Sequence, residues 1–317
     1  MTKLAIYQKA PAFLDRAGCL RAAVEAVAET SAAGARVVVF PEAYIPGYPA
    51  WIWRLRPGGD MRLADDLHRA VLENAVDLSA DHLRPLQDAA RQHHMTVVCG
   101  MHEREGTGSR GTLFNSVVTI GPDGEIRNRH RKVMPTNPER MVWGQGDATG
   151  IRAVDSECGR LGALICWESY MPLARFALYS QGIDLYIAPT YDSGDRWIAS
   201  ARHIAKEAGC WVVSSGVAIC GRDIRGAAPG LEALYPDPDE WVNAGDSVVV
   251  NPAGAIVAGP LHQEQGILYA DIDLAQIDTA RRTLDVVGHY ARPDLFTLQV
   301  RAVPLTSVEV DVKRTTS

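Results

Sequence analysis

The chain has 317 residues, 47% hydrophobic and 22% charged, which is typical of a globular protein with one large domain or two small ones. Its net charge of −6 comes from acids and bases mixed along the chain, so no long cationic surface for nucleic acid or anionic lipid is expected. No apolar run reaches the roughly 18 to 20 residues that span a bilayer, and residues 1–8 read as a short strand without a signal-peptide core. The sequence therefore predicts a cytoplasmic protein with neither nucleic-acid nor membrane partners.

Strand and helix signals alternate through the first two thirds of the chain. Short apolar runs predict strands at 4–7, 36–40, 96–102, 161–165, 185–188 and 211–216. Helices are predicted around Leu20, Val24 and Val27, at 63–76 and 82–93, and from near Pro172 and Gly194. Buried strands flanked by helices indicate a sheet that is covered on at least one face.

Two tight turns add antiparallel strands to this pattern. The segments Gly121-Pro122-Asp123-Gly124 and Asn251-Pro252-Ala253-Gly254 each lie between apolar or alternating stretches, with proline at the second turn position and glycine at the fourth. Two sheets with antiparallel edges are therefore predicted. From Ala291 the pattern dissolves, and 313–317 is expected to be a loose tail.

The six cysteines give no sign of a metal site or a disulfide framework. They are scattered without a C-x-x-C pair, at Cys19, Cys99, Cys158, Cys166, Cys210 and Cys220. His93, His94 and His102 near Cys99 have no zinc-type spacing. We expect free thiols in a reducing compartment and no metal.

Three polar residues follow predicted strands and together suggest a chemistry. They are Glu42 after 37–41, Lys132 after 127–131, and Cys166 after 161–165. Each alone has an ordinary explanation, as a solvated acid, an exposed basic strand or a small core cysteine. Together, a carboxylate, an ammonium and a thiol are the parts of a hydrolase that forms a covalent intermediate.

Local sequence suggests how two of these residues are placed. Met171-Pro172 opens a helix after Cys166, so the sulfur is expected in a strand-to-helix turn, where a nearby helix N-terminus favours thiolate. Strand alternation puts Lys132 on the same face as His130 and Asn128.

The segments around these residues resemble the nitrilase branch of the carbon-nitrogen hydrolase superfamily over nearly the whole chain. The matching segments are Phe40-Pro41-Glu42-Ala43, His130 to Arg140, Trp143-Gly144-Gln145-Gly146-Asp147 and Cys166-Trp167-Glu168. The Glu-Lys-Cys set of that family matches Glu42, Lys132 and Cys166, and its second glutamate matches Glu139. Ser169 stands where the branch commonly has asparagine, a departure that concerns substrate shape rather than reaction type.

The resemblance implies a fold and an assembly. The fold would be α/β (α+β), a four-layer α-β-β-α sandwich with two mixed sheets flanked by helices. Residues 1–290 would form the hydrolase domain, and 291–317 a C-terminal extension at a subunit interface or partly disordered. The family forms homodimers and often larger spiral oligomers, so self-association is expected, without metal or organic cofactor.

The resemblance also implies a reaction on a small-molecule nitrile. Cys166 would form a covalent thioimidate and then a thioester, with Glu42 as general base and Lys132 stabilising the tetrahedral intermediate. Glu139 would position Lys132, and the backbone N–H of Trp167 would act as an oxyanion donor. The products would be a carboxylic acid and ammonia.

Aromatic residues near the predicted site suggest where the substrate binds. Tyr48, Trp51, Thr190 and Tyr191 are the candidate pocket residues, although Trp51 could equally be core. Three alternatives remain open at this point: an amidase or carbamoyl hydrolase, a cyanide-hydrolysing enzyme with the same catalytic set, and a catalytically inactive interaction module.

Overall fold

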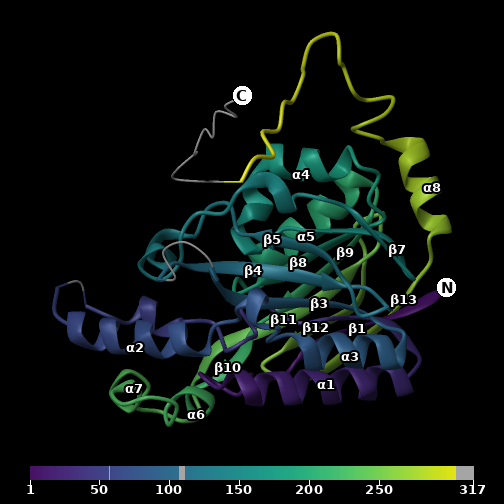
Figure 1. Ribbon diagram of the computed structural model, residues 1–317. Helices are drawn as coiled ribbons and strands as arrows, with labels where there is room; N and C mark the ends of the chain where they lie inside the picture. The colour runs from purple at the N-terminus through teal and green to yellow at the C-terminus, as the bar shows by residue number, and fades with distance from the viewer. Residues whose placement is uncertain (57, 107–110, 305–317) are drawn as a thin grey trace, which may run out of the picture.

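The computed structural model describes residues 1–56, 58–106 and 111–304, which form two mixed β-sheets flanked by helices (Figure 1). The first sheet has the strand order β13 (Gly266–Ile272), β1 (Thr2–Gln8), β2 (Ala35–Val39), β3 (Thr96–Arg104), β4 (Leu113–Ile120) and β5 (Ile126–Arg131). Within it β1, β2 and β3 are parallel, and the remaining pairs are antiparallel.

The second sheet has the order β10 (Ala218–Cys220), β11 (Trp241–Val250), β9 (Trp211–Gly216), β8 (Leu185–Thr190), β7 (Gly159–Ala163) and β6 (Val154–Ser156), with β12 (Ile256–His262) also paired to β11. Strands β7, β8 and β9 are parallel. The two predicted turns, at 121–124 and 251–254, connect β4 to β5 and β11 to β12 as expected.

The alternation of apolar residues along the strands creates the layers. In β1, Leu4 and Ile6 pack with Leu185 and Val213 between the two sheets, whereas Ala5 and Tyr7 belong to the core on the other face. That outer core is covered by α1 (Arg16–Ala32) and α3 (Arg84–His93). On the second sheet, α4 (Pro172–Tyr179) and α5 (Asp195–Ala208) cover the outer face. The predicted α-β-β-α order of layers is thus confirmed.

The remaining helices lie at the periphery. They are α2 (Met61–Asn74), α6 (Gly221–Ile224), α7 (Leu231–Leu234) and α8 (Ala275–Thr283), with 3-10 turns η1 (Ala50–Trp53), η2 (Leu78–Ala80), η3 (Asn137–Met141), η4 (Ala148–Gly150) and η5 (Cys166–Tyr170). Figure 1 shows α2, α6 and α7 at the end of the sandwich away from α8. None of the helices in the described ranges is long and apolar enough to cross a bilayer.

The C-terminal segment carries no helix or strand from 291 to 304, as predicted. Tyr290, Leu295 and Phe296 line a hollow together with Leu173 and Phe176 of α4. Residues 305–317 of the predicted extension, including the expected tail at 313–317, lie outside the described part of the chain.

Parallel strands bring the predicted polar residues to one end of the sandwich. Strands β2 and β5 run in the same direction, because two antiparallel pairings separate β5 from β3 and β3 is parallel to β2. The carboxyl ends of β2 and β5 therefore lie at the same end of the first sheet. Those of β7 and β8 lie at the same end of the second.

Candidate active site

Glu42 lies in the turn that follows β2. The turn packs directly on β3 because Gly100 has no side chain, and a β-carbon there would come within 2.2 Å of the Pro41 carbonyl oxygen. The Glu42 carboxylate is 1% exposed. It accepts hydrogen bonds from Asn115 Nδ2 and from the Tyr191 backbone N–H, both at 2.7 Å, so both oxygens have a fixed orientation.

Lys132 follows β5 and lies between two carboxylates. Its Nζ is 2.9 Å from Glu42 Oε1 and 2.8 Å from Glu139 Oε2, and its side chain is fully buried. The backbone is held by Gly146, whose N–H donates to the Lys132 carbonyl at 2.9 Å. A β-carbon at Gly146 would come within 2.3 Å of the Arg131 carbonyl oxygen, so the motif around 143–147 packs tightly against the lysine segment.

Glu139 is the third residue of the 3-10 turn η3, which begins after Thr136. Its Oε2 accepts the Thr136 backbone N–H at 2.7 Å as half of a capping box. Its Oε1 accepts the Tyr48 hydroxyl at 2.8 Å. The Glu139 carboxylate therefore contacts Lys132 while the Tyr48 hydroxyl and the Thr136 backbone N–H hold it in place.

Cys166 begins the turn η5, and α4 starts six residues later at Pro172, so the thiol lies in a strand-to-helix turn. β7 ends at Ala163 rather than directly before the cysteine. Cys166 has a φ of 53°, a left-handed conformation that non-glycine residues adopt only when their surroundings enforce it. The side chain is 4% exposed.

Glu168 ties the nucleophile turn to the lysine segment. Its buried carboxylate accepts the Ile165 backbone N–H and the Val133 backbone N–H, each at 2.7 Å, and the His130 Nε2–H at 2.9 Å. Ile165 directly precedes Cys166, and Val133 directly follows Lys132. One carboxylate thus fixes the backbone beside both the sulfur and the ammonium.

Burial dominates the electrostatics of the site. It raises the pKa of the Cys166 thiol to about 12. Glu42 and Glu139 raise this pKa further, whereas Lys132 and a hydrogen bond with Thr190 lower it. This net shift is opposite in direction to the preference for thiolate expected from the nearby helix N-terminus, so the thiol keeps its proton at neutral pH. Burial also raises the pKa of Glu42 above its usual range, although Lys132 opposes the shift. Burial works against the charge on Lys132, but Glu42 and the other nearby acids raise its pKa, so the ammonium keeps its proton.

A cavity of about 290 Å³ opens over Cys166. Its lining residues are Tyr48, Trp53, Thr136, Glu139, Cys166, Trp167, Tyr191, Asp192, Ser193 and Asn243. Tyr48 and Tyr191 stack with ring centroids 3.8 Å apart. This volume is at the small end of the range for ligand pockets.

Two predicted pocket residues do not line this cavity. Trp51 is buried in the core and packs edge-on against Phe13, with ring centroids 5.7 Å apart, so the core interpretation holds. Thr190 is also fully buried, and its hydroxyl bonds the Cys166 thiol and the Asp192 backbone N–H. Thr190, the last residue of β8, therefore contacts the Cys166 sulfur rather than lining the cavity.

Other site residues were not singled out from the sequence. Asn115 points from the middle of β4, and Asn243 comes from β11, where its amide donates to the Tyr191 carbonyl. Neither lies in a recognisable motif, since both are ordinary strand positions brought close by sheet pairing. Glu168 is different, because it lies inside the Cys-Trp-Glu segment and could have been recognised there.

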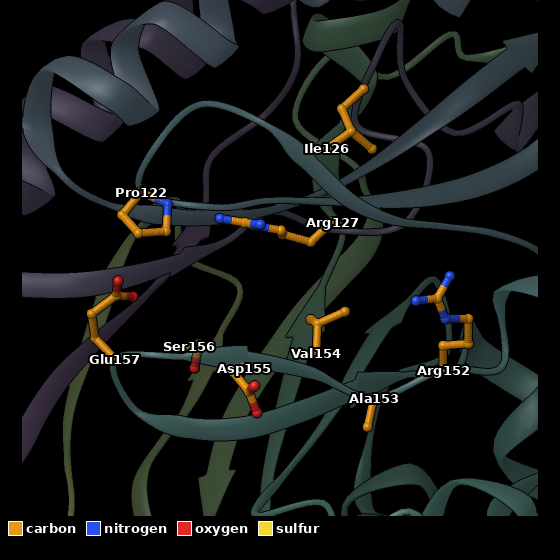
Figure 2. Close-up of a pocket in the computed structure, with 9 residues that line it drawn as sticks. All are labelled: Pro122, Ile126, Arg127, Arg152, Ala153, Val154, Asp155, Ser156 and Glu157. Carbon is orange, nitrogen blue, oxygen red and sulfur yellow. The ribbon is translucent and has the colours of Figure 1, made fainter.

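A larger hollow elsewhere carries no such chemistry. It has a volume of about 690 Å³ and lies between the edges of the two sheets, where Ile126 and Arg127 face the segment 152–157 (Figure 2). Its ionisable residues are Arg127, Arg152, Asp155 and Glu157, and its described lining contains no cysteine, lysine or histidine. Across the described residues, no group of three His, Cys, Asp or Glu could hold a metal ion.

Sequence comparison places the chain among proteins of one family. Residues 3–282 match the model of the carbon-nitrogen hydrolase family. The chain is 39% identical to Nitrilase 1 of Arabidopsis thaliana over 308 residues, which cover 96% of this chain and 86% of that protein. It is also 39% identical to an aliphatic nitrilase of Sinorhizobium fredii (strain HH103) over 316 residues, which cover 97% of this chain and 99% of that protein.

Structure comparison gives the same fold. Nit3 of Saccharomyces cerevisiae, a member of branch 10 of the nitrilase superfamily, superposes with a TM-score of 0.70 at 20% identity, covering 91% of this chain and 96% of that one. The family match and the long, closely related sequences establish that this protein belongs to the carbon-nitrogen hydrolase family and is a hydrolase of the nitrilase superfamily.

Proposed function

We propose that the protein is a nitrilase that converts an organic nitrile and two waters to a carboxylic acid and ammonia. The observation that carries this proposal is the enclosure of one thiol, two carboxylates and one ammonium beneath a small aromatic cavity. The names of the similar Arabidopsis and Sinorhizobium proteins support nitriles as the substrate class.

In the first step, the Cys166 sulfur attacks the nitrile carbon and Glu42 takes the thiol proton. The base is needed because a thiol with a pKa of about 12 is almost wholly protonated at neutral pH. The raised pKa of Glu42 suits it to accept that proton. The proton then passes to the nitrile nitrogen, and the product is a covalent thioimidate.

In the second step, a water activated by Glu42 adds to the thioimidate carbon. The tetrahedral intermediate expels ammonia as the C–N bond breaks, which leaves a thioester. A second water then breaks the C–S bond, releasing the acid and restoring the thiol. Lys132 and the Trp167 backbone N–H stabilise the negative charge that develops on the substrate, and Glu139 holds the lysine in place.

The test is to add phenylacetonitrile to the purified protein and measure acid, amide and ammonia, together with the intact mass. We expect acid and ammonia, and a covalent adduct that is absent in Cys166→Ala. The matched control is Cys210→Ala, because Cys210 is also buried and burial also raises its pKa to about 12. This control should keep both activity and adduct.

Alternative substrates distinguish the rival functions. Ammonia from phenylacetamide but none from phenylacetonitrile would make the protein an amidase. Faster turnover of inorganic cyanide than of any organic nitrile would make it a cyanide hydrolase, and no adduct with any of these compounds would leave an inactive module. All six cysteines are unpaired, which fits the cytoplasmic location that is also part of this proposal.

A further inference from the structure

The cavity over Cys166 has acidic residues on its walls and no cationic ones. Among its described lining residues, Asp192 and Glu139 are the acids, and none is lysine, arginine or histidine. Lys132 lies close by, but it binds Glu139 and Glu42, so two acids face its single charge. The cavity therefore offers a substrate no unmatched positive charge.

Asp192 adds a negative charge at the cavity wall that its partners do not cancel. Its Oδ2 accepts the indole N–H of Trp167 at 2.7 Å, and its Oδ1 accepts the Ser193 backbone N–H at 2.9 Å. Both donors are neutral, and both residues also line the cavity. The hydrogen bonds fix the carboxylate without neutralising it.

Arg54 lies behind the cavity wall and binds other residues. Arg54 influences Tyr191 electrostatically, but its guanidinium forms an ion pair with Glu240 and packs 4.2 Å from the centroid of the Tyr235 ring. Glu240 acts on Tyr191 with the opposite sign. Of the two acids that line the cavity, Glu139 forms an ion pair with Lys132, whereas the described hydrogen-bond donors to Asp192 are neutral.

We propose that the site accepts uncharged or cationic aryl and arylalkyl nitriles and rejects nitriles bearing a carboxylate, with Asp192 as the residue that determines this specificity. The inference rests on the proposed nitrilase function. Trp53, Trp167 and Tyr191 supply aromatic surface for the ring. A carboxylate on the substrate would lose hydration and meet a like charge, and such repulsion discriminates between substrates of equal size.

The test compares 4-acetylbenzonitrile with 4-cyanobenzoate, which are similar in shape but differ in charge, by measuring nitrile consumption. We expect kcat/KM of the native protein to be at least ~20-fold higher for the ketone. In Asp192→Asn, which keeps an oxygen for the indole N–H, this ratio should fall about 5- to 10-fold. Comparing ratios removes the intrinsic reactivity of each nitrile. The cationic 4-(aminomethyl)benzonitrile should be hydrolysed by the native protein.

Asp195→Asn is the matched control. Asp195 is exposed in the first turn of α5, three positions after Asp192, and does not line the cavity. Its substitution should leave the ratio within about two-fold of native, because a solvated charge is screened. Equal hydrolysis of the two nitriles by the native protein, or equal changes in the two variants, would overturn the specificity. Failure to consume any of these nitriles or phenylacetonitrile would instead overturn the nitrilase function itself.

Discussion

Charged residues in β5 and directly after it belong to two clusters of different composition. At its end, Lys132 lies between Glu42 and Glu139, one cation between two acids. The alternate positions Arg129 and Arg131 both bind Glu103 of β3, with N–O distances of 2.9 and 3.0 Å, and Arg131 also forms an ion pair with Glu105 at 3.7 Å. The adjacent residues Arg131 and Lys132 therefore belong to two different charge clusters.

The cations of the two clusters differ in their exposure to solvent. The side chains of Arg129 and Arg131 are 32% and 13% exposed, whereas that of Lys132 is fully buried. Burial raises the pKa of Glu103, but the two arginines outweigh it and hold the pKa below the usual range. Burial prevails at Glu42 and raises its pKa. Both carboxylates are buried, so the cations and acids beside each one determine the direction of its pKa shift: two arginines lower that of Glu103, whereas Glu42 shares one lysine with Glu139.

The largest expected effect comes from removing the enclosed cation. Lys132→Met should lower kcat by at least about 1,000-fold, because the charge on the intermediate loses its stabilising partner. It leaves Glu42 and Glu139 without a counter-charge, so the free energy of unfolding should also fall by about 3–5 kcal/mol. Single-turnover kinetics and thermal unfolding measure the two effects.

Arg129→Met tests the opposite cluster in the same way. It removes a cation from Glu103 but leaves Arg131, so kcat should stay within about two-fold of native and unfolding should change by only about 1 kcal/mol. Lys132→Arg retains the charge and is the second variant to measure if Lys132→Met does not fold. A folded Lys132→Met that kept more than a tenth of native activity would break the distinction between the clusters.

The next effect concerns how the reactive cluster is held in place. Glu168→Gln cannot accept both the Ile165 and Val133 N–H groups through carboxylate oxygens, so sulfur and ammonium should shift relative to each other. A shift of about 1 Å lowers kcat by roughly 10- to 100-fold, with KM within about two-fold. Steady-state kinetics on a neutral nitrile would show this split between kcat and KM.

Glu103→Gln is the matched control, since Glu103 is a similarly buried acid that accepts from the Arg129 and Arg131 side chains rather than from the Ile165 and Val133 backbone. Its kcat should remain near the native value even if its melting temperature falls as far as that of Glu168→Gln. Glu168→Asp should recover part of the lost kcat. Equal kinetic losses in Glu103→Gln and Glu168→Gln would mean that stability, not positioning, explains the effect.

Much of this arrangement was predictable from sequence, for a physical reason. Apolar runs fix which residues are strands, and the polar residue that ends a buried strand has to lie at a sheet edge. Lys132 follows β5 directly, whereas Glu42 follows β2 and Cys166 follows β7 after two intervening residues each. The resemblance to the family then added Glu139, and the structure brings its carboxylate within 2.8 Å of Lys132.

The sequence-based predictions are wrong or incomplete where three-dimensional packing determines the position of a residue. The sequence shows that Trp51 is aromatic but not that it packs on Phe13 instead of the cavity. It suggests a helix N-terminus near Cys166, but not the complete burial that keeps the thiol protonated. Asn115 reaches Glu42 only through the pairing of β3 with β4, which no local pattern specifies.

The pH dependence of the reaction should reveal the enclosed cluster. The acid limb of kcat/KM should lie above the ordinary carboxyl pKa of 4.5, because burial raises the pKa of Glu42, which must be ionised to act as base. No rise in rate should follow a free thiol pKa of about 8.5, since the pKa of Cys166 is raised to about 12. A rate that increased through pH 8 to 9 would mean that solvent ionises the thiol.

The smallest effect should appear in the stability of the other cluster. The folded pKa of Glu103 is lowered from 4.5, so its ion pairs stabilise the protein fully above that pH and lose their effect as the pH falls through the folded value. Glu103→Gln should therefore be less stable than native by about 1–3 kcal/mol at pH 6, and the gap should narrow toward pH 3. Urea unfolding at both pH values measures it. A gap that stayed constant would show that Glu103 contributes through packing, and the contrast between the two faces of β5 would then not be electrostatic.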